Sequence, residues 1–169
     1  TDIVLRNRGR GENLIEDFMI QANECVATHI FYMDLPFIYR VHEYPKEEKI
    51  RDFISFVQNL GYTVKFNTKD ISPKAIQNLI NQLKDKKEFK VLSSLLLRNM
   101  QKAIYLPQNL GHYGLASKCY THFTSPIRRY PDLFIHRIIS KYLEENYVVD
   151  DNWVEEYKEK ATERAALSS

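Results

Sequence analysis

The strongest constraint on the fold is a long stretch near the start of the chain in which apolar residues recur with the period of an α-helix. Between Glu12 and Met33 they lie three or four positions apart, on one helical face: Leu14, Ile15, Phe18, Met19, Ala22, Cys25, Val26, Ile30 and Met33. This spacing predicts one long amphipathic helix. The segments that follow decide the fold class to which this helix belongs.

Helical and extended patterns alternate along the rest of the chain. Aromatic and β-branched residues predict extended structure, in residues 35–43, 62–66 and 102–109. Apolar periodicity with proline, serine or glycine at the ends predicts further helices: from Pro45 to a stop at Gly61, from Ser72-Pro73 to Leu83, over 91–100, from Pro131 onward, and over about 151–166. Residues 84–88 are predicted to form a solvated turn, and residues 111–129 to form strand and loop. The order of elements predicts an α+β, helix-rich fold.

Composition limits the class of protein. The 169 residues suffice for one domain or for one half of a larger one, and a content of 44% hydrophobic residues excludes general disorder. No apolar run approaches the roughly 20 residues that span a bilayer, so no membrane association is expected. Two cysteines, Cys25 and Cys119, are too few for a disulfide framework, and we expect reduced thiols in or near a core. A cytoplasmic location follows as the default.

Positive charge is concentrated in one quarter of the chain. From Arg98 to Lys141 there are seven Lys/Arg residues and one acid, Asp132, so this segment carries +6. Because the whole chain carries +2, the remaining residues sum to −4. A concentrated positive field suggests a polyanionic partner, although charge also fluctuates along sequences without a functional reason.

The most unusual stretch of this basic segment is "YTHFTSPIRRYPDL" (120–133), which holds two adjacent arginines, Arg128 and Arg129, between two prolines. Like charges repel at this distance, so that either water or a bound anion must separate them. Arginine offers a planar fork that matches phosphate oxygens, and the predicted helix start at Tyr130-Pro131 favours an anion. The hydroxyls of Thr124 and Ser125 add donors. The stretch therefore predicts a phosphate-binding turn, with a solvated surface loop as the alternative.

Aromatic and titratable residues surround this turn. Four rings provide flat faces on which bases can stack, unless they belong to the core: Tyr113, Tyr120, Phe123 and Tyr130. His122 and His136 lack a partner at metal-ligand spacing, so we expect structural histidines that form hydrogen bonds. Glu16 and Asp17 are ordinary solvated helix acids on spacing alone.

The segment "GHYGLASKCYTHFTSPIRRYPDLFIHR" (111–137) closely resembles the signature of the RNB family, the ribonuclease II and ribonuclease R exoribonucleases. Three more segments resemble the same family: residues 3–27, 37–45 and 95–105. The sequence of residues 121–133 resembles the ribonuclease R branch more closely than the ribonuclease II branch. The resemblance extends over essentially the whole chain and implies the C-terminal portion of one RNB catalytic domain.

The resemblance implies an activity and several residue roles. Members of the family degrade single-stranded RNA processively from the 3′ end to 5′-nucleoside monophosphates, with Mg²⁺ held by a cluster of aspartates. The first arginine of the "SPIRR" motif, here Arg128, is implied to reach the scissile phosphate as the catalytic residue. The glutamate of the "IE-x-x-MI-x-AN" helix, here Glu16, is implied to contact the ribose of the 3′-terminal nucleotides. Thr124, Ser125, Arg129 and Tyr130 complete the expected RNA-binding set.

One departure from the family is expected to matter. The aspartate run that holds Mg²⁺ in the family lies upstream of the segments matched here, and these residues contain no such run. We therefore expect a fragment with no metal site, no cold-shock module and no S1 module, which behaves as a monomer and depends on ligands outside this chain. An alternative is a non-catalytic RNA-binding module. DNA binding is a weaker alternative, because no predicted helix carries a basic recognition face.

Overall fold

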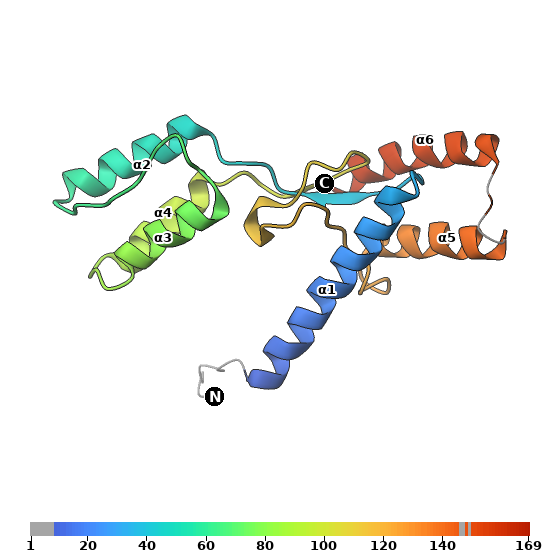
Figure 1. Cartoon of the computed structure of the whole chain (residues 1–169), viewed down its shortest axis with the longest axis horizontal. Helices are drawn as coiled ribbons and strands as arrows, with labels where there is room; N and C mark the ends of the chain where they lie inside the picture. Colours follow the sequence, from blue (N-terminus) through green and yellow to red (C-terminus); the bar gives the residue numbers. More distant parts are fainter. Residues whose placement is uncertain (1–8, 146–147, 149) are drawn as a thin grey trace. The chain divides into compact units, whose positions relative to one another are not determined.

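The computed structural model describes residues 9–145, 148 and 150–169, and the chain divides into two compact units. The first unit combines the segment up to Val41 with residues 104–109 and 118–169, and the second combines residues 42–103 with 110–117. The first holds α1 (Arg10–Tyr32), β1 (Tyr39–Val41), β2 (Ile104–Leu106), α5 (Tyr130–Glu144) and α6 (Asp151–Ser168) (Figure 1). The second holds α2 (Glu47–Asn59), α3 (Pro73–Leu83), α4 (Phe89–Asn99) and the 3-10 turn η1 (Tyr113–Leu115). The predicted α+β, helix-rich class is confirmed.

The sheet of the first unit is a single antiparallel pair, in which Tyr39 lies opposite Leu106, Arg40 opposite Tyr105 and Val41 opposite Ile104. Side chains alternate between the two faces of the strand. Phe37, Tyr39 and Val41 pack in one cluster with Ala27 and Ile30 of α1. On the opposite face, Ile38 joins a cluster formed with β2, α5 and α6: Tyr105, Phe134, Ile138, Trp153, Ala161 and Ala165. The short sheet is therefore covered by helices on both faces.

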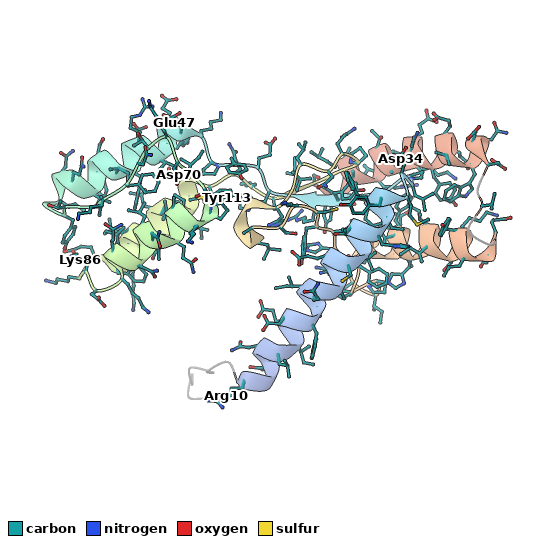
Figure 2. The ribbon with its side chains drawn as sticks, viewed as in Figure 1. Arg10, Asp34, Glu47, Asp70, Lys86 and Tyr113 are labelled. Atoms are coloured by element: carbon teal, nitrogen blue, oxygen red, sulfur yellow. The ribbon has the colours of Figure 1, made fainter. Side chains whose placement is uncertain are left out.

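Helix α1 packs on the rest of its unit only through its C-terminal half. Its buried residues are Asn23, Ala27 and Ile30. The first half extends beyond the sheet, with Arg10 at its far end (Figure 2), and exposes most of the apolar residues predicted to line its inner face: Leu14, Ile15, Phe18 and Met19. The predicted helix is confirmed, but burial of this half is not, because no other element of the described chain packs against it.

The second unit is built from three helices around one apolar core. Ser72 caps α3 by accepting a hydrogen bond from the Ala75 N–H at 3.3 Å, and Pro73 occupies the first turn, as predicted. Gly61 ends α2 with a φ of +86°. The N–H groups of Gly61 and Tyr62 donate to the carbonyls of Gln58 and Val57, which is the Schellman arrangement that glycine favours.

The predicted strand over residues 62–66 is wrong. This segment is irregular, although Val64 is buried in the helical core. The Gln82 side chain of α3 accepts from the Lys65 N–H at 2.8 Å and donates to the Lys65 carbonyl at 3.0 Å. A helix side chain thus satisfies the backbone groups that a neighbouring strand would have used.

The prediction of strand and loop for residues 111–129 holds only for the loop. The described segment contains the turn η1 and isolated bridges of His112 with His42 and with Ser117, and no continuous strand. Within the described helices, no segment is both long and apolar enough to cross a membrane.

Candidate phosphate-binding site

The turn that carries Arg128 is fixed by a buried asparagine of α1. The Asn23 side-chain amide donates to the Tyr120 hydroxyl at 3.0 Å. Its Oδ1 atom accepts from the N–H groups of Phe123 at 2.8 Å and Thr124 at 3.2 Å. Both ends of the amide are therefore satisfied, as a buried polar group requires. Asn23 was not predicted as a site residue, although a polar residue on the inner face of an amphipathic helix was a usable signal.

A prediction follows for this contact. Asn23→Ala would leave two backbone N–H groups without their acceptor, so we expect the free energy of unfolding to fall by about 2 kcal/mol. The single tryptophan, Trp153, lies in the core of the same unit, and its fluorescence during urea unfolding measures the change. Gln21→Ala on the exposed side of α1 is the matched control. An unfolding midpoint equal to that of the wild type would contradict the proposed anchoring.

The second fixed point of the turn is Asp132, in the first turn of α5, whose side chain is fully buried. Its Oδ2 atom accepts from the Ser125 N–H at 2.8 Å and from the Arg129 guanidinium at 2.8 Å. The anion beside Arg129 is thus a carboxylate of the same chain. Arg129 was predicted to bind RNA, and most of its charge is already balanced within the protein.

The side chain of Arg128 differs from that of Arg129 in its surroundings. The Ser125 carbonyl accepts from the N–H groups of Arg128 at 3.2 Å and Arg129 at 3.1 Å, which closes a tight turn. The turn carries Arg128 and Ile127 into solvent, and Ile127 is completely exposed. In the described part of the chain, the Arg128 guanidinium forms no salt bridge. The turn therefore presents to solvent an arginine that no acid of the described residues pairs with.

The remaining predicted RNA-binding residues are distributed around the same turn. Thr124 and Ser125 are half-buried, and their N–H groups bind Asn23 and Asp132. Tyr130 begins α5 and is 41% exposed, with the Arg164 guanidinium of α6 located 5.5 Å from its ring centroid. Glu16 lies seven positions before Asn23, on the same face of α1 and roughly 10 Å along its axis. Thr124, Ser125 and Tyr130 thus lie around the turn with the two arginines, and Glu16 lies farther along α1.

Both histidines near the turn are structural, as predicted. The Nδ1 atom of His122 lies 2.7 Å from the Tyr105 hydroxyl. The Nε2 atom of His136 lies 3.0 Å from the Phe123 carbonyl, and its ring stacks on the Phe123 ring with centroids 4.2 Å apart. These contacts hold the segment before the turn against β2 and α5.

The structure supports the core alternative for two of the four rings that were considered for base stacking. Tyr113 is buried in the helical core of the second unit, where its hydroxyl donates to the Ile71 carbonyl, and Tyr120 is buried in the first unit. Phe123 has one face on His136. Among the four rings, Tyr130 retains the greatest exposure.

The cysteines separate into one buried and one exposed thiol. Burial raises the pKa of Cys119 to about 11, so that this thiol is protonated and unreactive near neutral pH. Cys25 lies on the exposed side of α1, where its sulfur accepts from the Gln21 amide at 3.4 Å. Only Cys119 meets the expectation of a core position.

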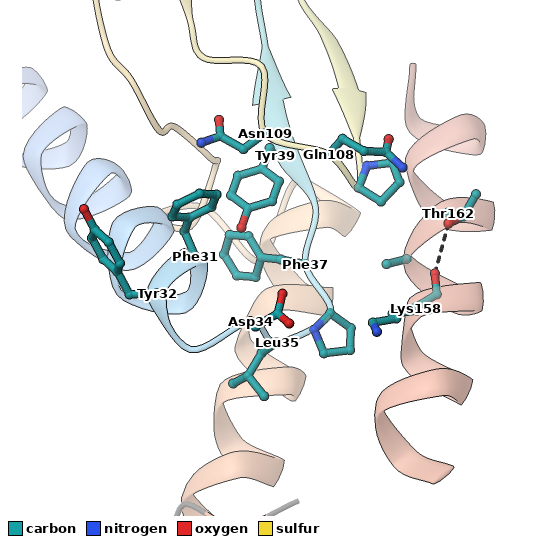
Figure 3. Close-up of a pocket in the computed structure, with 13 residues that line it drawn as sticks. Phe31, Tyr32, Asp34, Leu35, Phe37, Tyr39, Gln108, Asn109, Lys158 and Thr162 are labelled. Atoms are coloured by element: carbon teal, nitrogen blue, oxygen red, sulfur yellow. Dashed lines mark hydrogen bonds between the residues drawn. The ribbon is translucent and has the colours of Figure 1, made fainter. Parts of the chain in front are cut away.

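A concavity of about 550 Å³ lies elsewhere in the first unit and contains none of the predicted site residues. The rings of Phe31, Tyr32, Phe37 and Tyr39 line it together with Asp34 and Lys158 (Figure 3). Burial raises the pKa of Tyr39, so its hydroxyl remains neutral. Because its lining shares no residue with the turn that carries Arg128, this concavity is separate from the candidate site.

The residues described do not fit a divalent metal centre. No group of three or more His, Cys, Asp or Glu side chains converges within residues 9–145, 148 and 150–169. The Oδ2 atom of Asp132, the buried carboxylate of the turn, is already bonded to Ser125 and Arg129.

An exposed arginine on a tight turn, within a basic segment and without a salt bridge to any described residue, is typical of the sites at which nucleic-acid-binding proteins contact phosphate. Comparison with known protein families then identifies the family to which the chain belongs. Residues 1–145 match the RNB domain, and the chain therefore belongs to the RNB family.

Individual relatives agree with this assignment. Ribonuclease R of Thermotoga maritima is 47% identical over 156 residues, which are 92% of this chain and 22% of the relative. The structure of Mycoplasma genitalium RNase R in complex with ribose-methylated single-stranded RNA superposes with a TM-score of 0.86 and 34% identity, over 95% of this chain and 25% of that one. Yeast Ssd1, a pseudonuclease, superposes with a TM-score of 0.69 and 25% identity, over 96% of this chain and 20% of its own. The chain thus spans about a quarter or less of the length of these relatives.

Proposed function

We propose that this chain is the C-terminal portion of the RNB catalytic domain of a processive 3′→5′ exoribonuclease that hydrolyses single-stranded RNA to 5′-nucleoside monophosphates. In this proposal the chain supplies one wall of the RNA tunnel and Arg128 clamps the scissile phosphate. The observation that carries the proposal is the turn at Ser125–Arg129, which holds one arginine against an internal acid and presents the other to solvent. Family membership supports the same reading.

Each residue of the site has a proposed role. Arg128 donates to the oxygens of the scissile phosphate and stabilises the negative charge that develops there during hydrolysis. Arg129, held by Asp132, fixes the turn and adds a weaker attraction for the same phosphate. Thr124 and Ser125 offer hydroxyl donors, and Tyr130 offers a ring face to a base or ribose. Glu16 accepts from a ribose hydroxyl near the 3′ end.

We also propose that Mg²⁺ is bound by carboxylates outside this chain, because the described residues do not form a metal centre. When bound, Mg²⁺ would activate water for attack on phosphorus. The intact protein is proposed to be a cytoplasmic monomer that binds single-stranded RNA.

A second function is a non-catalytic RNA-binding module. The observation that favours it is the superposition on yeast Ssd1, a pseudonuclease, because that likeness shows that this fold does not by itself guarantee catalysis. Translating the DNA upstream of the codon for Thr1 discriminates the two functions. A D-x₅-DDA-like aspartate run there supports the nuclease, and its absence supports the binding module.

A gel with 5′-labelled single-stranded RNA and Mg²⁺ tests the chain itself. We expect the RNA to stay intact and to shift at low salt, with the shift lost at moderate salt, because phosphate contacts release counterions. A ladder that shortens to a small end product would show that carboxylates of this chain suffice for metal binding. RNA that neither shifts at low salt nor shortens would contradict the proposed RNA-binding role.

A further inference from the structure

Arg40 belongs to the family-like segment 37–45 but not to the predicted site residues, and its side chain lies close to the candidate site. It stands on β1 directly opposite Tyr105 of β2, so the two side chains share one face of the sheet. The Arg40 guanidinium carbon lies 4.5 Å from the centroid of the Tyr105 ring. This cation–π contact holds the half-buried arginine in one orientation.

Two contacts connect this pair to the segment that carries Arg128. The Arg40 N–H donates to the Tyr120 carbonyl at 2.9 Å, at the start of the segment that leads into the turn. The Tyr105 hydroxyl lies 2.7 Å from Nδ1 of His122, two residues farther along. From there the anchors at Asn23 and Asp132 fix the path to Arg128. Arg40 is therefore held in a fixed relation to the same turn.

The charges around Tyr105 are unbalanced. Burial raises the pKa of the Tyr105 hydroxyl, and the guanidinium groups of Arg40, Arg129 and Arg128 act in the opposite direction. Asp132 is the acid that acts on the same hydroxyl, and Arg129 already pairs with it. Among the described residues, neither Arg40 nor Arg128 forms a salt bridge. Two positive charges thus lie near one buried ring, and no acid among the described residues pairs with either of them.

We propose that Arg40 is a second phosphate-binding residue, which contacts the RNA backbone at the phosphate next to the one that Arg128 binds. The proposal rests on the proposed function, because the ligand is the same single-stranded RNA. Tyr105 acts as a positioning residue, since its ring orients the Arg40 guanidinium and its hydroxyl is fixed by His122. A guanidinium oriented in advance loses little entropy when it binds a phosphate oxygen.

The salt dependence of RNA binding tests this role. The 169-residue chain is titrated with fluorescein-labelled oligouridylate at several salt concentrations. Arg40→Met keeps a long stem over the Tyr105 ring but removes the charge. We expect it to reduce the slope of log Kobs against log[salt] by about 0.7, the value for one phosphate contact on a single strand, and to weaken binding about tenfold at low salt. Arg40→Gln is a second neutral variant with the same expected effect.

Three further variants separate a phosphate contact from a structural role. Arg40→Lys keeps the charge and is expected to keep the slope. Tyr105→Phe keeps the ring and is expected to retain most of the affinity. Arg51→Met removes an arginine that pairs with Glu47 on the surface of α2, and it is expected to leave the slope unchanged while lowering the net charge equally.

The outcomes distinguish this inference from the proposed function. A wild-type slope that Arg40→Met and Arg40→Gln leave unchanged, with melting curves that show folded variants, overturns the role of Arg40 and leaves RNA binding by the chain intact. Absence of salt-dependent binding by the wild type overturns both. A lower slope in Arg40→Lys as well would assign Arg40 to packing and overturn the phosphate contact.

Discussion

Replacing Arg128 by alanine in the full-length protein is expected to lower the turnover of single-stranded RNA by about 10²–10³-fold. The turn from Ser125 to Arg129 is held through backbone N–H groups and through Asp132, and the Arg128 side chain forms no salt bridge with a described residue. Its loss should therefore leave the fold intact. Because the guanidinium is proposed to act on charge that develops in the transition state, RNA affinity should change only a few-fold.

Single-turnover hydrolysis with saturating protein measures this rate without interference from product release. Arg128→Lys retains a positive charge without the bidentate fork and should recover only part of the rate. Arg51→Ala, on the surface of α2, is the matched control and should hydrolyse RNA at the wild-type rate. Turnover by Arg128→Ala equal to that of the wild type would remove Arg128 from the catalytic role, whatever the affinity of the variant.

The parts of the fold that the sequence predicts well are those with a local cause. Ser72-Pro73 caps α3 and Gly61 ends α2, because the chemistry of a helix end depends on residues within one turn of it. The strand prediction for residues 62–66 is wrong because strand formation depends on residues far away in the sequence. Their composition resembles a strand, but a strand requires a neighbour, and Gln82 of α3 takes the available backbone groups of Lys65.

At the candidate site, too, the sequence predicts the features with a local cause and misses those that depend on distant residues. The sequence predicts Arg128 on a stiff turn, because proline and the paired arginines are adjacent in the chain. It does not reveal that Asp132 neutralises Arg129 while leaving Arg128 exposed, although both arginines stand within four positions of this acid. Asn23 and Arg40 are farther away still, 102 and 85 positions before Ser125, and only the folded chain brings them to the turn.

Asp132 is expected to be the most important single residue for the stability of the first unit. Its carboxylate is fully buried and binds both the Ser125 N–H and the Arg129 guanidinium. Asp132→Ala leaves a largely buried guanidinium and a backbone N–H without their acceptor. Removing one partner of a buried ion pair typically lowers the free energy of unfolding by about 3–5 kcal/mol, and we expect a value in that range. Urea unfolding followed by Trp153 fluorescence measures it.

A double variant separates the ion pair from the packing around it. In Arg129→Met/Asp132→Leu neither charge remains, so the desolvation penalty that the single variant incurs disappears, and most of the lost stability should return. Arg129→Met alone should destabilise the unit because it leaves Asp132 buried without its cation. If the double variant were as unstable as Asp132→Ala, the Ser125 N–H and the shape of the turn would be the dominant contribution of Asp132. The pair would then matter for holding Arg128 in place more than for balancing Arg129.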